Sequence, residues 1–193
     1  MARPREFDLD QVLDHSMNLF WDHGYLGTTM SDVVEHTGVN RASLYNTFGG
    51  KHELFLAAVG RYQREVHLEL VGMLDQPGSP KAAIRRTMRQ VAADALDVAG
   101  ERGCLLTNSA VELAAYDREV RDRVVESFDR LARAFEHAVI RGQECGEISP
   151  RRSARKVARF LVNAVHGLAV IGKTKPSRRA VQDIVDLTLA VLD

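Results

Sequence analysis

Apolar residues recur along most of this chain with the 3.6-residue period of amphipathic helices, and no run alternates with period two for long enough to be a strand. Turns fall where glycine, proline or a polar capping residue interrupts the pattern. The predicted helices cover residues 8–23, 30–37, 41–48, 51–74, 80–98, 104–115, 117–142, 149–171 and 177–192. The sequence therefore predicts an all-α protein of about nine helices, without repeats or low-complexity tracts.

Two short helices joined by a tight turn stand out between residues 28 and 54. Thr29 is a good N-cap, and Asp32 can reach back to it as an acidic variant of the capping box. Gly38 follows the first helix at a position where a positive φ favours glycine, and Asn40 caps the second helix. Leu44 points back toward a core. This arrangement is typical of a helix-turn-helix that reads DNA.

The outer face of the second helix carries the candidate DNA contacts. Arg41 could make a bidentate contact to guanine, and Asn46 could read adenine or bind phosphate. For Tyr45 we expect a packed ring with its hydroxyl on a phosphate. A helical hairpin that only packs is the alternative, but packing does not require so many exposed polar side chains. The predicted contact residues are Thr28, Thr29, Asn40, Arg41, Ala42, Ser43, Tyr45, Asn46 and Lys51.

This stretch resembles the N-terminal signature of the TetR (tetracycline-repressor) family. The matching positions are Gly24-Tyr25, Thr28-Thr29, Gly38-Val39, Ser43-Leu44-Tyr45, Phe48, Lys51 and Leu54, and the resemblance covers roughly residues 8–60. It implies a dimeric, all-helical bacterial repressor that is released from a (pseudo)palindromic operator by a small molecule. Gly50 departs from the Ser or Asp usual there and predicts a weaker helix cap. We expect residues 1–50 to form the DNA-binding domain and residues 51–193 the effector-binding and dimerisation domain.

Composition supports a globular protein of the reducing cytoplasm. The chain has 193 residues, of which 45% are hydrophobic. No segment has the roughly 18 apolar residues that a membrane span requires, and the N-terminus has no apolar signal region. Cys104 and Cys145 do not make a disulfide framework. We therefore expect a cytoplasmic location and no membrane partner.

The charge of the predicted head argues against strong, sequence-independent DNA binding. The whole chain has a formal net charge of zero, and residues 1–56 contain four basic and eight acidic residues. Phosphate attraction scales with the number of cations that meet the backbone. Binding should therefore depend on backbone N–H groups at helix N-termini, on hydroxyl groups and on dimer geometry.

Cys104 lies in the segment Arg102-Gly103-Cys104-Leu105, which resembles a GCL segment of TetR regulators that respond to electrophiles, hypochlorite and related stress, and of some metal-responsive members. A cysteine at a helix N-terminus beside Arg102 is expected to have a lowered pKa and more reactive thiolate. The alternative is a small buried hydrophobe that only packs. Cys145, between two acids, is expected to be less reactive.

The body of the chain is expected to hold an organic effector, apolar or aromatic, or one that reacts with thiols. We expect its cavity between the helices at 51–74, 80–98, 117–142 and 149–171. The predicted lining residues are Tyr62, Met88, Cys104, Leu105, Phe128, Asn163 and His166. Asn163 and His166 lie one helical turn apart, and the alternative for them is a hydrogen-bonded pair at a dimer seam.

The last two helices carry more apolar surface than one small body can cover, which indicates a helix-on-helix dimer seam. The family resemblance implies the same location, a four-helix bundle with two helices from each subunit. The predicted seam residues are Phe160, Val165, Leu168, Ile184, Thr188 and Val191.

Other function classes find less support in the sequence. The chain has no phosphate-binding glycine loop, no paired histidines at metal-binding spacing and no Gly-x-Ser-x-Gly motif. We therefore predict no enzyme, no cofactor and no metal site. A helical adaptor that binds protein partners and not DNA remains the alternative to a DNA-binding repressor.

Overall fold

The computed structural model describes residues 7–193, with the side chains of residues 67, 98 and 99 left aside. Its α-helices are α1 (Leu9–His23), α2 (Met30–Thr37), α3 (Arg41–Phe48), α4 (Lys51–Tyr62), α5 (Leu68–Leu74), α6 (Pro80–Leu96), α7 (Leu105–Leu113), α8 (Arg118–Glu144), α9 (Ala154–Gly172) and α10 (Arg178–Leu189). A π-helical segment, Gln63–His67, joins α4 to α5, and 3-10 turns cover Val98–Arg102 and Ala190–Leu192. With α4, the π segment and α5 counted as one rod, the described chain has the predicted nine helices.

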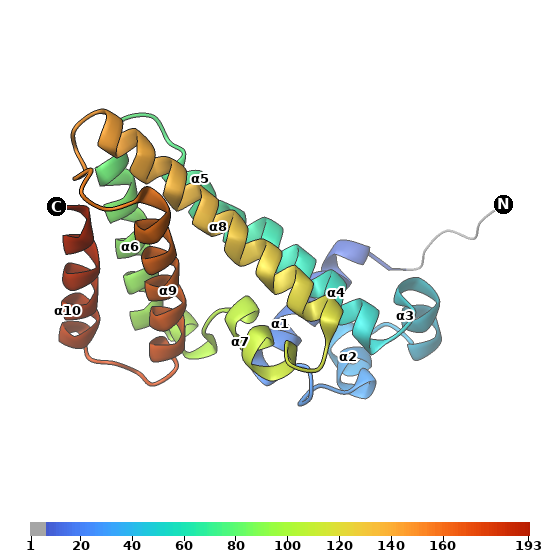
Figure 1. Cartoon of the computed structure of the whole chain (residues 1–193). Coiled ribbons are helices and arrows are strands. Elements are labelled where there is room, and N and C mark those ends of the chain that lie inside the picture. The colour runs from blue at the N-terminus through green and yellow to red at the C-terminus, as the bar shows by residue number, and fades with distance from the viewer. Residues whose placement is uncertain (1–6) are drawn as a thin grey trace.

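The helices form two groups joined by long rods (Figure 1). The first group, α1 to α3, lies at one end, and α6, α9 and α10 lie at the other. The 27-residue helix α8 runs alongside α5 from one group to the other. No helix of the described residues is long and apolar enough to cross a membrane.

Two hydrophobic cores follow this division. The first core packs α1 to α4 together with α7 and the first turns of α8. The second packs α6, the rest of α8, α9 and α10. The core around the predicted DNA-binding helices thus extends beyond residue 50 and includes Leu54, Phe55 and Tyr62 of α4 as well as Leu105 and Leu106 of α7. Because α4 and α7 share this core with α2 and α3, a movement of α4 or α7 would shift α2 and α3 as well.

Two predicted helix boundaries differ from the structure. The prediction started a helix at Ser149-Pro150, but α9 begins at Ala154 with Ser153 as N-cap. The Ser149 N–H instead donates to the Leu192 carbonyl at 3.0 Å, and the Gln143 amide donates to the Ser149 carbonyl at 3.0 Å. Residues 149–152 are therefore a turn that ties α8 to the C-terminus. The predicted helix 80–98 likewise ends at Leu96, before a 3-10 turn.

Candidate DNA-reading head and effector cavity

The start of α2 is fixed by the predicted capping box. The Thr29 N–H donates to the Asp32 carboxylate at 2.7 Å, and the Asp32 N–H donates to the Thr29 hydroxyl oxygen at 3.2 Å. These hydrogen bonds, from the Thr29 backbone first and its side chain second, lower the pKa of Asp32. An ionised carboxylate at a helix N-terminus also stabilises the helix dipole. The cap sets where α2 begins and hence where α3 emerges.

The turn between α2 and α3 uses a left-handed glycine. Gly38 has φ 68°, and its N–H donates to the Val34 carbonyl at 2.9 Å, which closes α2. Val39 then buries its side chain, and the Asn40 side chain accepts the Ser43 N–H at 2.9 Å to cap α3. Leu44 is fully buried against the head. The helix-turn-helix predicted from the sequence is therefore present, with caps as expected.

One face of α3 is open to solvent and free of acids. Arg41, Ala42, Tyr45 and Asn46 are exposed, and Ser43 is half-buried. The Arg41 guanidinium lies 5.7 Å from the centre of the Tyr45 ring, whose side chain is 39% exposed. This pairing holds a long cation over an aromatic ring at the helix surface. The face thus offers a guanidinium, an amide and a phenol. These groups can form hydrogen bonds with base edges and with phosphates.

Three of the residues predicted to contact phosphate, Thr28, Thr29 and Lys51, have partners inside the protein, and the Thr29 hydroxyl donates to the Asp32 carboxylate at 2.9 Å. Thr28 is buried, and its hydroxyl donates to the Gly24 carbonyl at 2.7 Å, which does not support a phosphate contact by this hydroxyl. Lys51 donates from Nζ to the Thr28 carbonyl at 2.7 Å and lies 4.1 Å from the Tyr25 ring centre. Lys51 therefore links the start of α4 to the loop before α2, and any contact with DNA comes in addition to that structural task.

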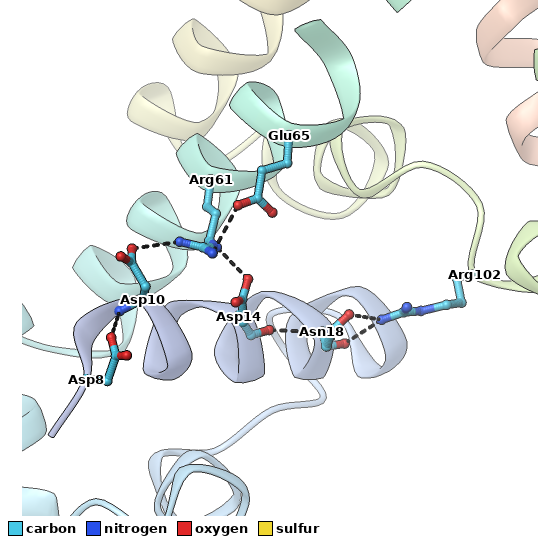
Figure 2. Close-up of polar contacts among 7 residues, drawn as sticks. All are labelled: Asp8, Asp10, Asp14, Asn18, Arg61, Glu65 and Arg102. Atoms are coloured by element: carbon cyan, nitrogen blue, oxygen red, sulfur yellow. Dashed lines mark hydrogen bonds and ion pairs between the residues drawn. The ribbon is translucent and has the colours of Figure 1, made fainter. Parts of the chain in front are cut away.

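Arg61, which lies beyond the residues counted above, compensates part of the negative charge of the head. Arg61 of α4 lies within ion-pair distance of Asp10 and Asp14 of α1 and of Glu65 in the π segment (Figure 2). Arg61 is only 14% exposed, so these contacts lie close to the packed surface between the two helices. The acidic residues counted in the sequence thus partly belong to the α1–α4 contact, which the count over residues 1–56 could not reveal.

The segment from Arg102 to Asp117 contacts the head at the C-terminal half of α1 and just beyond it. Figure 2 shows Arg102 reaching α1, where it donates to the Asn18 carbonyl and side-chain oxygens at 3.0 Å. The Trp21 indole N–H donates to the Gly103 carbonyl at 3.0 Å, and the Arg102 guanidinium lies 4.2 Å from the Trp21 ring centre. The carboxylate of Asp22 lies 2.6 Å from Arg102 Nε, at ion-pair distance but without hydrogen-bond geometry.

Two further links come from α7 and the start of α8. The Glu112 carboxylate accepts the N–H groups of Tyr25 and Leu26 at 3.0 and 2.7 Å, just after the end of α1. The ring of His52, on the first turn of α4, lies 2.7 Å from the Asp117 carboxylate that caps α8. Sequence reasoning missed these contacts because their partners are 65 to 87 residues apart.

A cavity of about 300 Å³ lies beside the Trp21–Gly103 contact, and both of these residues line it. Its walls come from Trp21 of α1, from α4, the π segment and α5, from α6 and the loop after it, and from α9. Of the predicted lining residues, Tyr62, Cys104 and His166 are there. Val165, predicted for the dimer seam, also lines it. The cavity therefore touches both the body and, through Trp21, the head.

The remaining predicted lining residues lie elsewhere. Met88 and Leu105 are buried in the second and first cores, and Asn163 is exposed on α9. Phe128 of α8 stacks on His166 with 3.8 Å between ring centres and stands behind that wall. The prediction placed α8 around the cavity, whereas α1 takes that position. Helical periodicity tells which face of α8 is apolar but not which neighbour it meets.

Cys104 sits at the wall of the cavity next to the Tyr62 hydroxyl. Burial raises the pKa of Tyr62 well above its ordinary value, and the hydrogen-bonded Cys104 thiol adds to that effect, whereas the Leu105 N–H opposes it. Arg102, expected to activate the thiol, is engaged with Asn18 and Trp21 instead. Cys145 is exposed.

The residues predicted for a dimer seam divide into two sets. Val165, Leu168 and Thr188 are buried within the protomer, whereas Phe160 is 46% exposed and Ile184 and Val191 are half-buried. Val170 and Leu187, which sequence reasoning missed, are 49% and 77% exposed. Part of the predicted seam therefore faces outward, and Val170 and Leu187 extend that apolar surface.

Comparison with known families identifies this architecture. Residues 12–58 match the family described as bacterial regulatory proteins, tetR family, and residues 75–187 match the tetracyclin repressor-like C-terminal domain. The chain belongs to the TetR family. The two matches correspond to the reading head and to the body that carries the cavity, so the expected fold is confirmed over both parts.

Relatives of this TetR protein are transcriptional regulators rather than enzymes. An uncharacterised helix-turn-helix regulator, YezE of Bacillus subtilis, is 34% identical over the whole length of both chains. The repressor ComR of Escherichia coli is 27% identical, over 97% of this chain and 90% of its own. A cysteine-substituted form of the TetR regulator CifR, solved with a 26-base-pair operator DNA, superposes with a TM-score of 0.87 at 26% identity, with both chains fully covered.

The TetR assignment decides between the function classes left open by the sequence. The chain is a helix-turn-helix transcriptional regulator, and the adaptor alternative finds no support among these relatives. No group of three or more His, Cys, Asp or Glu residues in the described part of the chain could hold a metal ion.

Proposed function

We propose that this protein is a dimeric repressor that binds a palindromic operator through α3 and leaves it when a small molecule occupies the cavity. The observation that carries the proposal is the exposed, acid-free face of α3, held by caps at both helices of the motif. The similar regulator CifR was solved with a double-stranded operator DNA, which supports operator binding by this chain.

A palindromic site requires two heads, and the surface of α9 and α10 supports pairing there. Phe160, Val170 and Leu187 expose apolar side chains on these two helices. Packing the two helices of each subunit against their copies would bury this surface in a four-helix bundle. The two α3 helices should then lie about 34–36 Å apart, or modestly farther, to enter successive major grooves. Light scattering should give the mass of a dimer, and a stable monomer at micromolar concentration would contradict the proposal.

Arg41→Ala tests the reading face. We expect the substitution to cost about 1–3 kcal/mol at the specific operator and to relax base preference, because one bidentate base contact is lost. A gel shift with DNA from the protein's own operon and with scrambled DNA measures both quantities. Arg133→Ala, exposed on α8, is the matched control. Unchanged affinity and unchanged preference in Arg41→Ala would show that α3 does not read the operator.

Release by an effector follows from the position of the cavity. A ligand shifts the protein from its DNA-competent form only by the difference in its affinity for the two forms. Trp21 is part of both α1 and the cavity wall, and α4 lies between the cavity and the head. A ligand that displaces Trp21 or Tyr62 would therefore move the helices on which α2 and α3 rest.

Thiol chemistry at Cys104 is the second way in which the same cavity could act. If the protein senses electrophiles, Cys104→Ser should keep operator binding and lose release by quinones or N-ethylmaleimide. If it senses a reversible ligand, the same substitution should be nearly silent. Thiol labelling of the folded dimer, with the exposed Cys145 as internal reference, distinguishes the two. A Cys104 that resists labelling leaves the reversible ligand.

A further inference from the structure

The cavity has an apolar interior and an acidic mouth. Tyr62, Val91 and Val165 are buried in its wall, together with the half-buried Leu70 and Met73. Glu69 on α5 and Asp94 on α6 belong to the same lining; both residues are exposed overall, and the Asp94 carboxyl group is partly buried against the cavity. A ligand that fills this space thus meets apolar carbon inside and negative charge at the entrance.

No lysine or arginine belongs to this lining in the described part of the chain. Among the same residues, neither Glu69 nor Asp94 forms an ion pair, and the recorded side-chain partner of Asp94 is the neutral Gln90 amide at 2.8 Å. Burial raises the pKa of Asp94, the Gln90 hydrogen bond opposes this, and the charges of Glu69 and Asp97 raise it further. The two carboxylates therefore place negative charge at the mouth, and no lysine or arginine of the lining neutralises it.

Three basic residues beside the loop that follows α6 have partners outside the mouth of the cavity. Arg102 contacts Asn18 and Trp21 on α1. Lys173 donates to the Arg102 carbonyl at 3.3 Å, and Lys175 pairs with Glu101 at 2.9 Å. These interactions keep the basic groups beside the loop that follows α6. The lining itself supplies no lysine or arginine to complement the mouth, and a cationic ligand would supply that charge.

We propose that the effector of this cavity is an organic cation, a protonated or quaternary amine on a compact apolar or aromatic body. The cationic centre would lie between Glu69 and Asp94, and the apolar body against Tyr62 and Leu70. This inference rests on the proposed function, because it names the chemical class of the ligand that releases the repressor. A cavity of about 300 Å³ has the volume of about ten liquid waters and fits a body of roughly that many heavy atoms.

The charge of the ligand can be isolated with two probes of the same shape. Phenyltrimethylammonium and tert-butylbenzene differ only in whether nitrogen or carbon carries the three methyl groups. A purely apolar cavity favours the neutral compound, because a cation loses more hydration on burial. We expect the cation to bind about tenfold or more tightly than the neutral compound, measured by calorimetry and by the fluorescence of Trp21, the single tryptophan in the chain.

Substitutions of Glu69 and Asp94 test whether these carboxylates cause the preference for the cation over the neutral probe. Glu69→Gln and Asp94→Asn should each weaken binding of the cation about fivefold and leave tert-butylbenzene unchanged, and added salt should weaken only the cation. Glu144→Gln, exposed at the end of α8, is the matched control. Equal binding of the two probes, no binding of the cation, or unchanged affinity in both mouth variants would overturn the proposal.

Ligand-free operator binding is measured separately in the same preparations. A protein that shifts its operator but shows no cation preference disproves the ligand class and leaves the repressor intact. A protein that binds the cation but shifts no DNA disproves the repressor function instead.

Discussion

Two arginines contact opposite ends of α1, and they belong to different parts of the molecule. Arg61 meets Asp10 and Asp14 at the N-terminal half of α1 and Glu65 on its own helical rod (Figure 2). Every partner in this cluster lies in α1 or in the rod formed by α4 and the π segment. The cluster therefore fixes two helices of one core to each other.

Arg102 belongs to the other side of the molecule. It comes from the loop before α7 and contacts Asn18 and Trp21 at the C-terminal half of α1. Trp21 is also a wall of the cavity, and its indole N–H is bound to Gly103 of the same loop. Arg61 therefore joins two helices of the head, whereas Arg102 contacts Trp21, a residue that a ligand in the cavity would also contact.

The largest change is expected when the first arginine is removed. Arg61→Ala leaves the facing carboxylates of Asp10 and Asp14 without their cation, and we expect a loss of about 1–2 kcal/mol in the free energy of unfolding, since the partners are partly exposed. For a chain of this size that corresponds to roughly 2–4 °C in Tm per kcal/mol. Calorimetry of the variant beside Arg133→Ala measures it. An unchanged Tm would show that the cluster does not stabilise the head.

Removal of the second arginine should affect coupling more than stability. We expect Arg102→Ala to lower the free energy of unfolding by about 1 kcal/mol or less and to reduce the coupling between ligand and operator by about 0.5–2 kcal/mol. Calorimetric ligand titrations with and without operator DNA give that coupling as a ratio of affinities. If Arg61→Ala and Arg102→Ala alter coupling equally, the two sides of α1 do not have separate roles.

A smaller effect is expected at the Asp117–His52 contact, the third tie between head and body. Burial works against ionisation of Asp117, but the Val120 N–H and His52 outweigh it and lower the pKa of Asp117. A lowered folded-state pKa gives stability that is present above the unfolded value of about 3.9 and is lost as pH falls through the folded value. Asp117→Asn keeps a good cap but removes the charge. Urea midpoints of the two proteins should differ at pH 6 and converge below about pH 4; a constant difference would contradict this assignment.

The smallest effect is expected at the weak N-cap of α4, within the head. Gly50 caps α4 in extended backbone without a side-chain hydrogen bond. Gly50→Ser adds the missing acceptor and should raise the free energy of unfolding by a few tenths of a kcal/mol. Thermal unfolding detects the gain, and titration with ligand and operator should show unchanged coupling. A change in coupling would mean that head stability alone tunes release.

Local chemistry was enough to predict the head. Thr29 with Asp32, Gly38 and Asn40 specify two helix starts and one helix end through contacts between residues three or four apart, and these contacts are present. Apolar periodicity likewise predicted nine helices. Capping and periodicity depend only on residues close together in the chain, so they predict helix bounds without knowledge of the tertiary structure.

Long-range geometry could not be predicted in the same way. Trp21 reads as one more apolar residue of the first helix, and nothing near it in the sequence indicates that it walls a cavity with Val165. Asn163 reads as a polar group in an apolar helix, yet it faces outward. The face of a helix follows from its sequence, but the identity of its neighbour depends on crossing angles and on contacts such as that between Trp21 and Gly103.

The sparse positive charge of the head has a consequence for how the protein searches for its site. Residues 1–56 contain four basic residues, Arg3, Arg5, Arg41 and Lys51, so a dimer would present eight such cations. Each neutralised phosphate contributes about 0.9 to the slope of log K against log salt, so the heads would give a slope no steeper than about −7, of which Arg41 and Lys51 supply about −3.6. The protein would hold arbitrary DNA weakly, travel mostly through solution between encounters, and keep its operator occupied over a broad range of intracellular salt.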